Sequence, residues 1–201
     1  IPNVHADSSG ALVGLAYSLG VPTAVMENVY FNMLDNCRKR IWFGAISTEH
    51  DIAMNTLFKI GNFKNIQNNS KFTVGVTSFF NQYYQYSNWK EKKIVRKYTH
   101  KTMVIPFLTK THPTLEIDGA FTNNNEYDIT IGTDAGFDIY TSTSWKQKLS
   151  PPTKKQAKQL IDLGYTITKQ YSFAITKKKN VVDPIYSTII MLFLWPLKLL
   201  A

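Results

Sequence analysis

Asp7-Ser8-Ser9-Gly10-Ala11-Leu12-Val13, continuing to Leu19, is the stretch that decides how this chain begins to fold. Apolar residues recur along it at the spacing of one helix face, and Asp7 or Ser8 stands where an N-cap residue would. Gly20 and Pro22 then end the pattern. We therefore predict a helix over residues 7–19 with Ser8 at its amino end. The apolar face consists of Leu12, Leu15, Ala16 and Leu19.

Further along the chain, apolar residues first recur at helical spacing, then alternate with polar residues, and then return to helical spacing. A short helix is expected over 25–34, and a longer one starts at Ser47 or Thr48 and stops at Gly61. A third helix starts at Ser150 with Pro151 at its first position and reaches Gly164. Alternating apolar residues predict strands over 63–66, 72–80, 94–108, 114–121, 127–132, 137–145 and 165–175. This order predicts an α+β fold in which N-terminal helices pack on an antiparallel sheet.

Composition indicates a folded protein with a basic surface. The 201 residues are 44% hydrophobic and 18% charged, which is typical of a globular chain with a real core. The net charge of +9 is carried almost wholly by lysine, because the only arginines are Arg38, Arg40 and Arg96. Lysine suits diffuse attraction to polyanions such as nucleic acid, acidic membranes or teichoic-acid-bearing walls. A lysine-rich soluble surface with no partner explains the same charge equally well.

Cysteine and the chain ends limit the remaining classes. The single cysteine, Cys37, excludes an intrachain disulfide and a cysteine-based metal cluster within one chain. His5, His50 and His112 show no metal-ligand spacing, so we expect surface or loop histidines and no cofactor. The absence of Met at Ile1 predicts a processed or truncated start. The apolar segment Ile185–Leu200 is short for a membrane span, so it predicts a buried terminal element, with an interfacial membrane anchor as the alternative.

Residue 8 has the position of a catalytic nucleophile. The run Asp7-Ser8-Ser9-Gly10 followed by an apolar residue and Val resembles the Asp-Cys-Ser-Gly motif that opens the catalytic helix of NlpC-type and phage-lysin cysteine peptidases. Serine stands here in place of their cysteine. Met54, Leu57, Gly61, Phe63 and Ile66 match the second helix of related lysins, and the run from His100 to Ile105 resembles the strand that carries their histidine.

This resemblance covers roughly residues 5–108 and implies a papain-like cell-wall peptidase core over 1–110. A β-rich extension with one helix would follow over 111–201. It implies Ser8 as nucleophile, His100 as general base and His112 or a nearby polar residue as the orienting residue, acting on the peptide or amide linkages of peptidoglycan. A secreted or phage-associated location would follow.

The serine leaves three interpretations open. The fold has drifted to a non-catalytic role, the chain is an inactivated variant, or Ser8 is a true serine nucleophile. A serine hydroxyl is much less acidic than a thiol, so a histidine that pairs with a thiolate is a weak activator for it. Ser8 as an ordinary helix cap is the simplest alternative.

A second hypothesis is a non-enzymatic module that binds nucleic acid or another polyanion. Aromatic rings and positive charge alternate over 83–97, and such mixtures bind single-stranded nucleic acid or sugars. A hairpin with a packed aromatic face and solvated lysines gives the same pattern without any ligand. The residues that would bind are Tyr83, Tyr84, Tyr86, Trp89, Lys92, Lys93 and Arg96.

Overall fold

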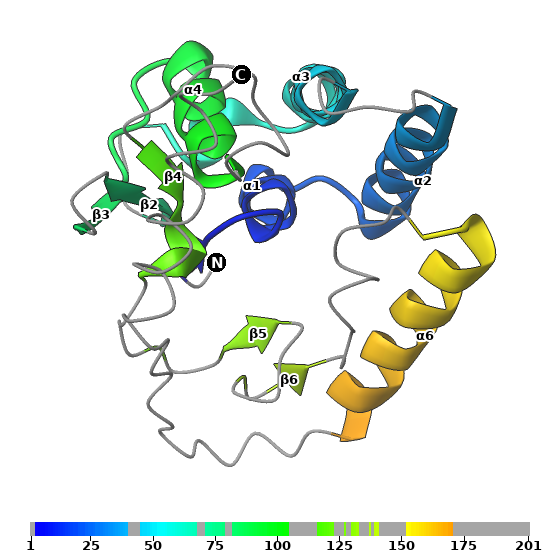
Figure 1. The fold of residues 1–201 in the computed structure, drawn as a ribbon. Helices are drawn as coiled ribbons and strands as arrows, with labels where there is room; N and C mark the ends of the chain where they lie inside the picture. The colour runs from blue at the N-terminus through cyan, green and yellow to red at the C-terminus, as the bar shows by residue number, and fades with distance from the viewer. Residues whose placement is uncertain are drawn as a thin grey trace, which may run out of the picture.

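The computed structural model describes residues 3–39, 45–67, 71–78, 82–104, 116–122, 127, 130–132, 137, 139–140 and 152–170. Within these residues the fold is α+β. Five helices accompany a four-stranded sheet and a separate two-stranded sheet (Figure 1). The helices are α1 (Gly10–Leu19), α2 (Thr23–Lys39), α3 (Ala45–Ile60), α4 (Lys92–Thr102) and α6 (Lys154–Gln170). The strands are β1 (Val4–Ala6), β2 (Phe72–Ser78), β3 (Tyr83–Tyr86), β4 (Glu116–Asp118), β5 (Ile131–Gly132) and β6 (Ile139–Tyr140).

The main sheet is built around β2 and is mixed, not antiparallel as we predicted from the sequence. β1 pairs with β2 in parallel, whereas β3 and β4 both pair with it antiparallel. The parallel pair arises because the chain passes through three helices between β1 and β2, and so re-enters the sheet in the same direction. β5 and β6 form the second sheet, also in parallel.

Two strands share one edge of β2 and meet end to end. β1 covers residues 72–74 of β2, and β4 covers residues 76–78. β3 overlaps both in register, because it pairs with residues 74–77. Since a strand has only two edges, β1 and β4 must lie on the edge opposite β3. Their ends, Ala6 and Asp118, therefore face each other across Gly75.

The helices pack beside this sheet and bury the core. α1 packs on β1 and β2, α4 packs on β2 and β4, and α3 contacts both of these helices. α2 packs against α3 and α6, and Figure 1 shows α2 and α6 on the side of the helices away from the main sheet. The core is one apolar cluster in which the predicted helix face of α1 is buried. Its largest fully buried apolar side chains are Trp89, Phe72, Leu15, Leu19, Met54 and Ile66.

Three predicted strands are wrong. Residues 92–102 form α4, whose buried positions Val95, Thr99 and Thr102 recur at helical spacing. Residues 63–65 form a 3₁₀ helix after α3, capped by the Asn62 side chain. The last helix continues through residue 170, beyond the stop expected at Gly164. β-branched and aromatic residues suggested strands in the first and last of these segments, but tertiary burial on one helix face decides the outcome.

The N-terminal cap was also predicted wrongly. α1 begins at Gly10 with Ser9 as its N-cap residue, and no side chain caps it. Asp7 and Ser8 lie before the helix and bond elsewhere.

The predicted apolar terminal element and the predicted orienting histidine both fall on residues that the structure does not describe. Ile185–Leu200 and His112 lie outside the described residues. No helix of the described part has both the length and the apolar character needed to cross a bilayer.

Candidate functional site

The turn between β1 and α1 forces Ser8 into a strained backbone conformation. Ser8 has φ of 54° and is the only non-glycine residue with positive φ among those the structure describes. The left-handed region costs a residue with a Cβ roughly 1–2 kcal/mol, and such strain concentrates at functional sites. The Ser8 N–H donates to Thr102 Oγ1 of α4 at 3.0 Å, which holds the turn in place. Ser8 therefore stands on a tight strand-to-helix turn fixed from α4.

The Ser8 side chain lies close enough to the carboxyl group of Asp118 to lower the pKa of that group. Asp118 lies at the end of β4, is 4% exposed, and also accepts the Ala120 N–H at 2.9 Å. Burial, to which the charge of Asp7 adds, raises the pKa of Asp118 to about 7 against the opposing interactions with Ser8 and the Ala120 N–H. A carboxyl group with this pKa exchanges protons near neutral pH. Such behaviour is what a general base needs.

Asp7 is held beside this pair by His5 and Tyr83. Asp7 Oδ1 lies 3.2 Å from His5 Nε2 and accepts the Tyr83 hydroxyl at 3.2 Å. His5 Nε2 also lies 2.5 Å from the Tyr83 hydroxyl, and its Nδ1 lies 2.7 Å from Thr73 Oγ1. Burial, then the charge of Asp7, raises the pKa of Tyr83 far above its usual range, so the phenol stays a donor. The three side chains form a half-buried polar network at the strand ends.

Two glycines make room for this convergence. A Cβ on Gly75 would lie 2.1 Å from both Asp7 Oδ1 and the Tyr83 hydroxyl. A Cβ on Gly119 would lie 2.3 Å from the Gly75 carbonyl oxygen and 2.7 Å from Asp7 Oδ1. Only residues without a side chain fit here, so the meeting of Asp7 with the end of β4 depends on both glycines.

The exposed side of the turn offers hydrogen-bond donors. α1 has no side-chain cap and no acidic residue in its first turn, and Ser9 and Gly10 are exposed. The N–H groups at the start of a helix have no partner within the helix and carry partial positive charge. The Ala11 and Leu12 N–H groups already donate to the Ser8 and Ser9 carbonyls, so the donors left beside residue 8 are the N–H groups of Ser9 and Gly10.

The histidine that the sequence paired with Ser8 has a different neighbour. His100 lies on α4, and its ring meets that of His50 on α3 edge-on, with centroids 5.2 Å apart. Thr102, which accepts the Ser8 N–H, lies two positions later in the same helix, and positions two apart face nearly opposite ways. The described contacts bring Ser8 to Thr102 and Asp118, and His100 to His50.

The aromatic residues of the predicted binding segment make contacts within the fold, with Trp89 buried and the three tyrosines partly buried. Trp89 is 0% exposed and donates its indole N–H to the Phe72 carbonyl at 2.6 Å, and Tyr86 stacks on Tyr98 with centroids 3.8 Å apart. Tyr83 belongs to the network around Asp7, and the Tyr84 hydroxyl donates to Glu116. These contacts give the rings structural roles. They are the kind of contacts expected if the aromatic face is packed without any ligand.

The basic residues of that segment lie on α4, away from the network around Asp7. Lys92, Lys93 and Arg96 open α4 and line a pocket against α3.

The prediction that His5 and His50 are surface or loop residues is wrong. His5 sits in β1 within the network at the strand ends, and His50 is 1% exposed inside α3. Asp118 and Asp7 were also missed as site residues. The available signal was a carboxylate within a predicted strand and directly before a glycine, Asp118-Gly119. Only the strand register shows that it reaches Asp7.

Neither a metal-binding cluster nor a similarity to known proteins assigns a function to this site. No group of three or more His, Cys, Asp or Glu residues in the described part of the chain is arranged to hold a metal ion. Comparisons with protein-family models, with curated proteins and with solved structures found no match to this chain.

Proposed function

We propose that this protein is a hydrolase that uses Ser8 as its nucleophile and Asp118 as its general base. One observation carries the proposal: a serine held at positive φ on a strand-to-helix turn lies beside a buried carboxyl group whose pKa is about 7. A serine hydroxyl needs an adjacent base to become a nucleophile, and a base acts best when its pKa lies near the working pH. Asp118 meets both requirements.

The reaction follows from this geometry. Asp118 takes the Ser8 hydroxyl proton as Oγ forms a bond to the carbonyl carbon of the substrate, and the carbonyl electron pair moves to oxygen. The N–H groups of Ser9 and Gly10 stabilise that oxyanion. The protonated Asp118 then gives its proton to the leaving group as the bond to carbon breaks. Water, deprotonated by Asp118, releases the acyl group from Ser8. His5, Asp7 and Tyr83 act as positioning residues for the turn.

The substrate class rests on the resemblance to NlpC-type and phage-lysin peptidases. In those enzymes the nucleophile precedes a helix that packs on the sheet, and residue 8 precedes α1, which packs on β1 and β2. The base differs, because Asp118 takes the role that the resemblance gives to His100. We propose peptide or amide bonds of the bacterial cell wall as the substrate, within a papain-like core.

The test of the mechanism is covalent labelling by a fluorophosphonate, which reacts with activated serines. Ser8→Ala should abolish labelling, and mass spectrometry of the wild-type protein should place the label on residue 8. Ser9→Ala is the matched control, because Ser9 is exposed and adjacent. Asp118→Asn should slow labelling at least about 100-fold, the lower end of what a positioned base contributes. Labelling that survives in Ser8→Ala rules the mechanism out.

The substrate has a separate test. Purified bacterial walls carrying a covalent dye should release it with the wild type and not with Ser8→Ala. Ser8→Cys restores the residue of the cysteine peptidases and should retain release. Fluorophosphonate labelling without dye release would keep the hydrolase and discard the cell wall as its substrate.

A further inference from the structure

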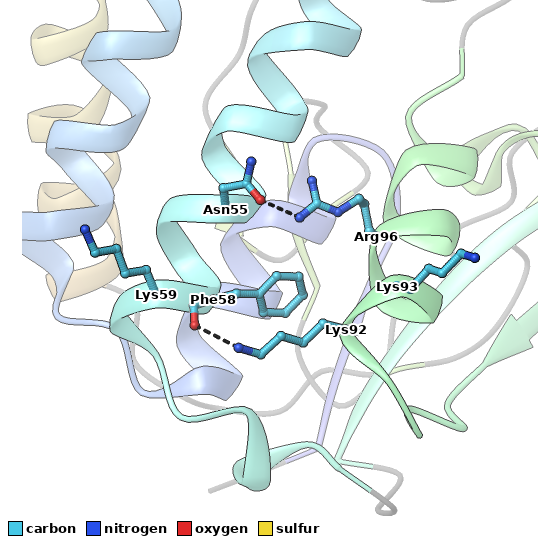
Figure 2. A pocket seen from close by; sticks show the side chains of 6 residues that line it. All are labelled: Asn55, Phe58, Lys59, Lys92, Lys93 and Arg96. Carbon is cyan, nitrogen blue, oxygen red and sulfur yellow. Dashed lines mark hydrogen bonds between the residues drawn. The ribbon is translucent and has the colours of Figure 1, made fainter.

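A pocket lies between α3 and α4, on a different pair of elements from the Ser8 site. Its volume is about 440 Å³. Figure 2 shows Lys92 and Arg96 reaching from α4 toward α3, with Lys59 and Lys93 extending at opposite sides. The lining residues are Asn55, Phe58, Lys59, Lys92, Lys93 and Arg96. Four of the six are permanently or normally cationic at neutral pH.

Two of these cations are fixed by α3. The Lys92 ammonium donates to the Phe58 carbonyl at 3.2 Å and lies 5.6 Å from the centroid of the Phe58 ring. The Arg96 guanidinium donates to Asn55 Oδ1 at 2.6 Å and to Asp51 Oδ1 at 3.2 Å. Cations held in place before a ligand arrives lose little side-chain freedom on binding. The pocket is therefore pre-organised on its α4 side.

The charge of the pocket is not balanced by the residues that line it. Asp51 offsets part of the charge of Arg96, and none of the six lining residues is acidic. Lys59 and Lys93 are exposed, and neither makes an ion pair with any residue that the structure describes. Each lysine ammonium carries three donors, so both can turn toward an anion in the pocket. Positive charge concentrated in a concave site attracts anions more strongly than the same charge spread over a surface.

We propose that this pocket binds the phosphate group of a small phosphorylated molecule. Lysine ammonium groups bind phosphate as point charges, and the Arg96 guanidinium adds a fixed positive charge at the back of the site. The volume is within the range for small organic ligands, so the phosphate can carry a further moiety. A long polyanion is less suited, because single-stranded nucleic acid needs exposed rings for stacking, whereas Trp89 is buried and Tyr86 is partly buried and stacked on Tyr98.

The experiment is calorimetric titration of the full chain with inorganic pyrophosphate at low ionic strength, and with an oligothymidylate in parallel. Lys93→Glu and Lys59→Glu each change one exposed residue and should weaken pyrophosphate binding about tenfold or more, as expected for a lost hydrogen bond to a charged group. Lys155→Glu is the matched control. It makes the same charge change on the exposed face of α6. It should leave affinity within about twofold, because screening weakens distant surface charges.

Three results would overturn the proposal. The first is that pyrophosphate does not bind the wild type. The second is that Lys155→Glu weakens pyrophosphate binding as much as Lys93→Glu does. The third is that only the oligothymidylate binds the wild type, and that Lys93→Glu weakens this binding. The last result would assign the pocket to a nucleic-acid backbone. Fluorophosphonate labelling of Ser8 is independent of all three, so this proposal and the hydrolase proposal fail separately.

Discussion

His50 is the group whose titration should most clearly govern stability at acid pH. His50 is 1% exposed, and neither ring nitrogen has a hydrogen-bond partner among the residues that the structure describes. Burial, helped by the neighbouring His100 and Arg96, lowers the pKa of His50 to about 4 against the opposing effect of Asp51. The folded protein thus keeps His50 neutral down to about pH 4, whereas the unfolded chain protonates it at its ordinary pKa of 6.5.

The size of the effect follows from the difference between these two pKa values. Each pKa unit is worth about 1.4 kcal/mol, so protonation of the unfolded state should remove about 3 kcal/mol of unfolding free energy between about pH 6.5 and about pH 4. The contribution is fully present above the unfolded pKa and is lost as the pH falls, because only the unfolded state binds the proton. That loss is a large fraction of the stability of an ordinary domain.

Asp118 should produce the opposite trend over much of the same range. Its pKa is raised from 3.8 to about 7, so the folded state holds a proton that the unfolded state has released. Its contribution is fully present below the unfolded pKa and is lost as the pH rises through about 7, by about 4 kcal/mol. Between about pH 4 and about pH 6.5 the two slopes nearly cancel in the wild type. Only single substitutions separate them.

The measurement is urea unfolding of the wild type, His50→Leu and Asp118→Asn at several values between about pH 4.5 and about pH 7.5. Leucine fills a buried site without a titratable group, so the advantage of His50→Leu over the wild type should grow as the pH falls. The advantage of Asp118→Asn should instead grow as the pH rises. A His50→Leu difference that stays constant across the range would refute the reasoning about His50.

Three further outcomes follow from the structure. Gly75→Ala should destabilise the fold by roughly 1–3 kcal/mol in thermal unfolding and abolish fluorophosphonate labelling, because its Cβ would displace Asp7. Gly10→Ala is the control and should leave the unfolding temperature unchanged, because its Cβ would meet nothing within 4 Å. Trp89→Ala should lower the urea unfolding free energy by about 3–5 kcal/mol and leave pyrophosphate affinity unchanged at temperatures where the variant is folded, since Trp89 is a core residue outside the pocket. The rate of Ser8 labelling should rise with pH and level off above about pH 7, as Asp118 ionises; a rate independent of pH would exclude Asp118 as the base.

Helix ends that are marked by glycine could be predicted from the sequence. α1 ends at the predicted Gly20, whose φ of 75° is the left-handed conformation expected of a helix-ending glycine. α3 ends before Gly61 as predicted. β2 was found from its run of β-branched residues. These features are local, because each depends on residues within a few positions of the boundary.

α4 was missed although its signal was present. Val95, Thr99 and Thr102 are spaced by four and three, which is helical, but the neighbouring Ile94 and Val95 gave a competing strand pattern. The residues of the site were missed for a different reason. The contact between Ser8 and Asp118 joins positions more than a hundred residues apart, and it follows from the register on β2. Such register is set by packing across the whole sheet, which no single stretch of sequence contains.

The shared edge of β2 has a consequence for how the chain can be divided. A fragment that ends at residue 104 would keep the pairing of β1 but leave the backbone of Val76, Thr77 and Ser78 uncovered on that side. Exposed strand backbone of this kind recruits other chains, so the fragment should self-associate more strongly than the full chain. Thr77 would also lose its buried bond to the Asp118 carbonyl. The amino-terminal half therefore depends on three residues from the second half to close its own sheet.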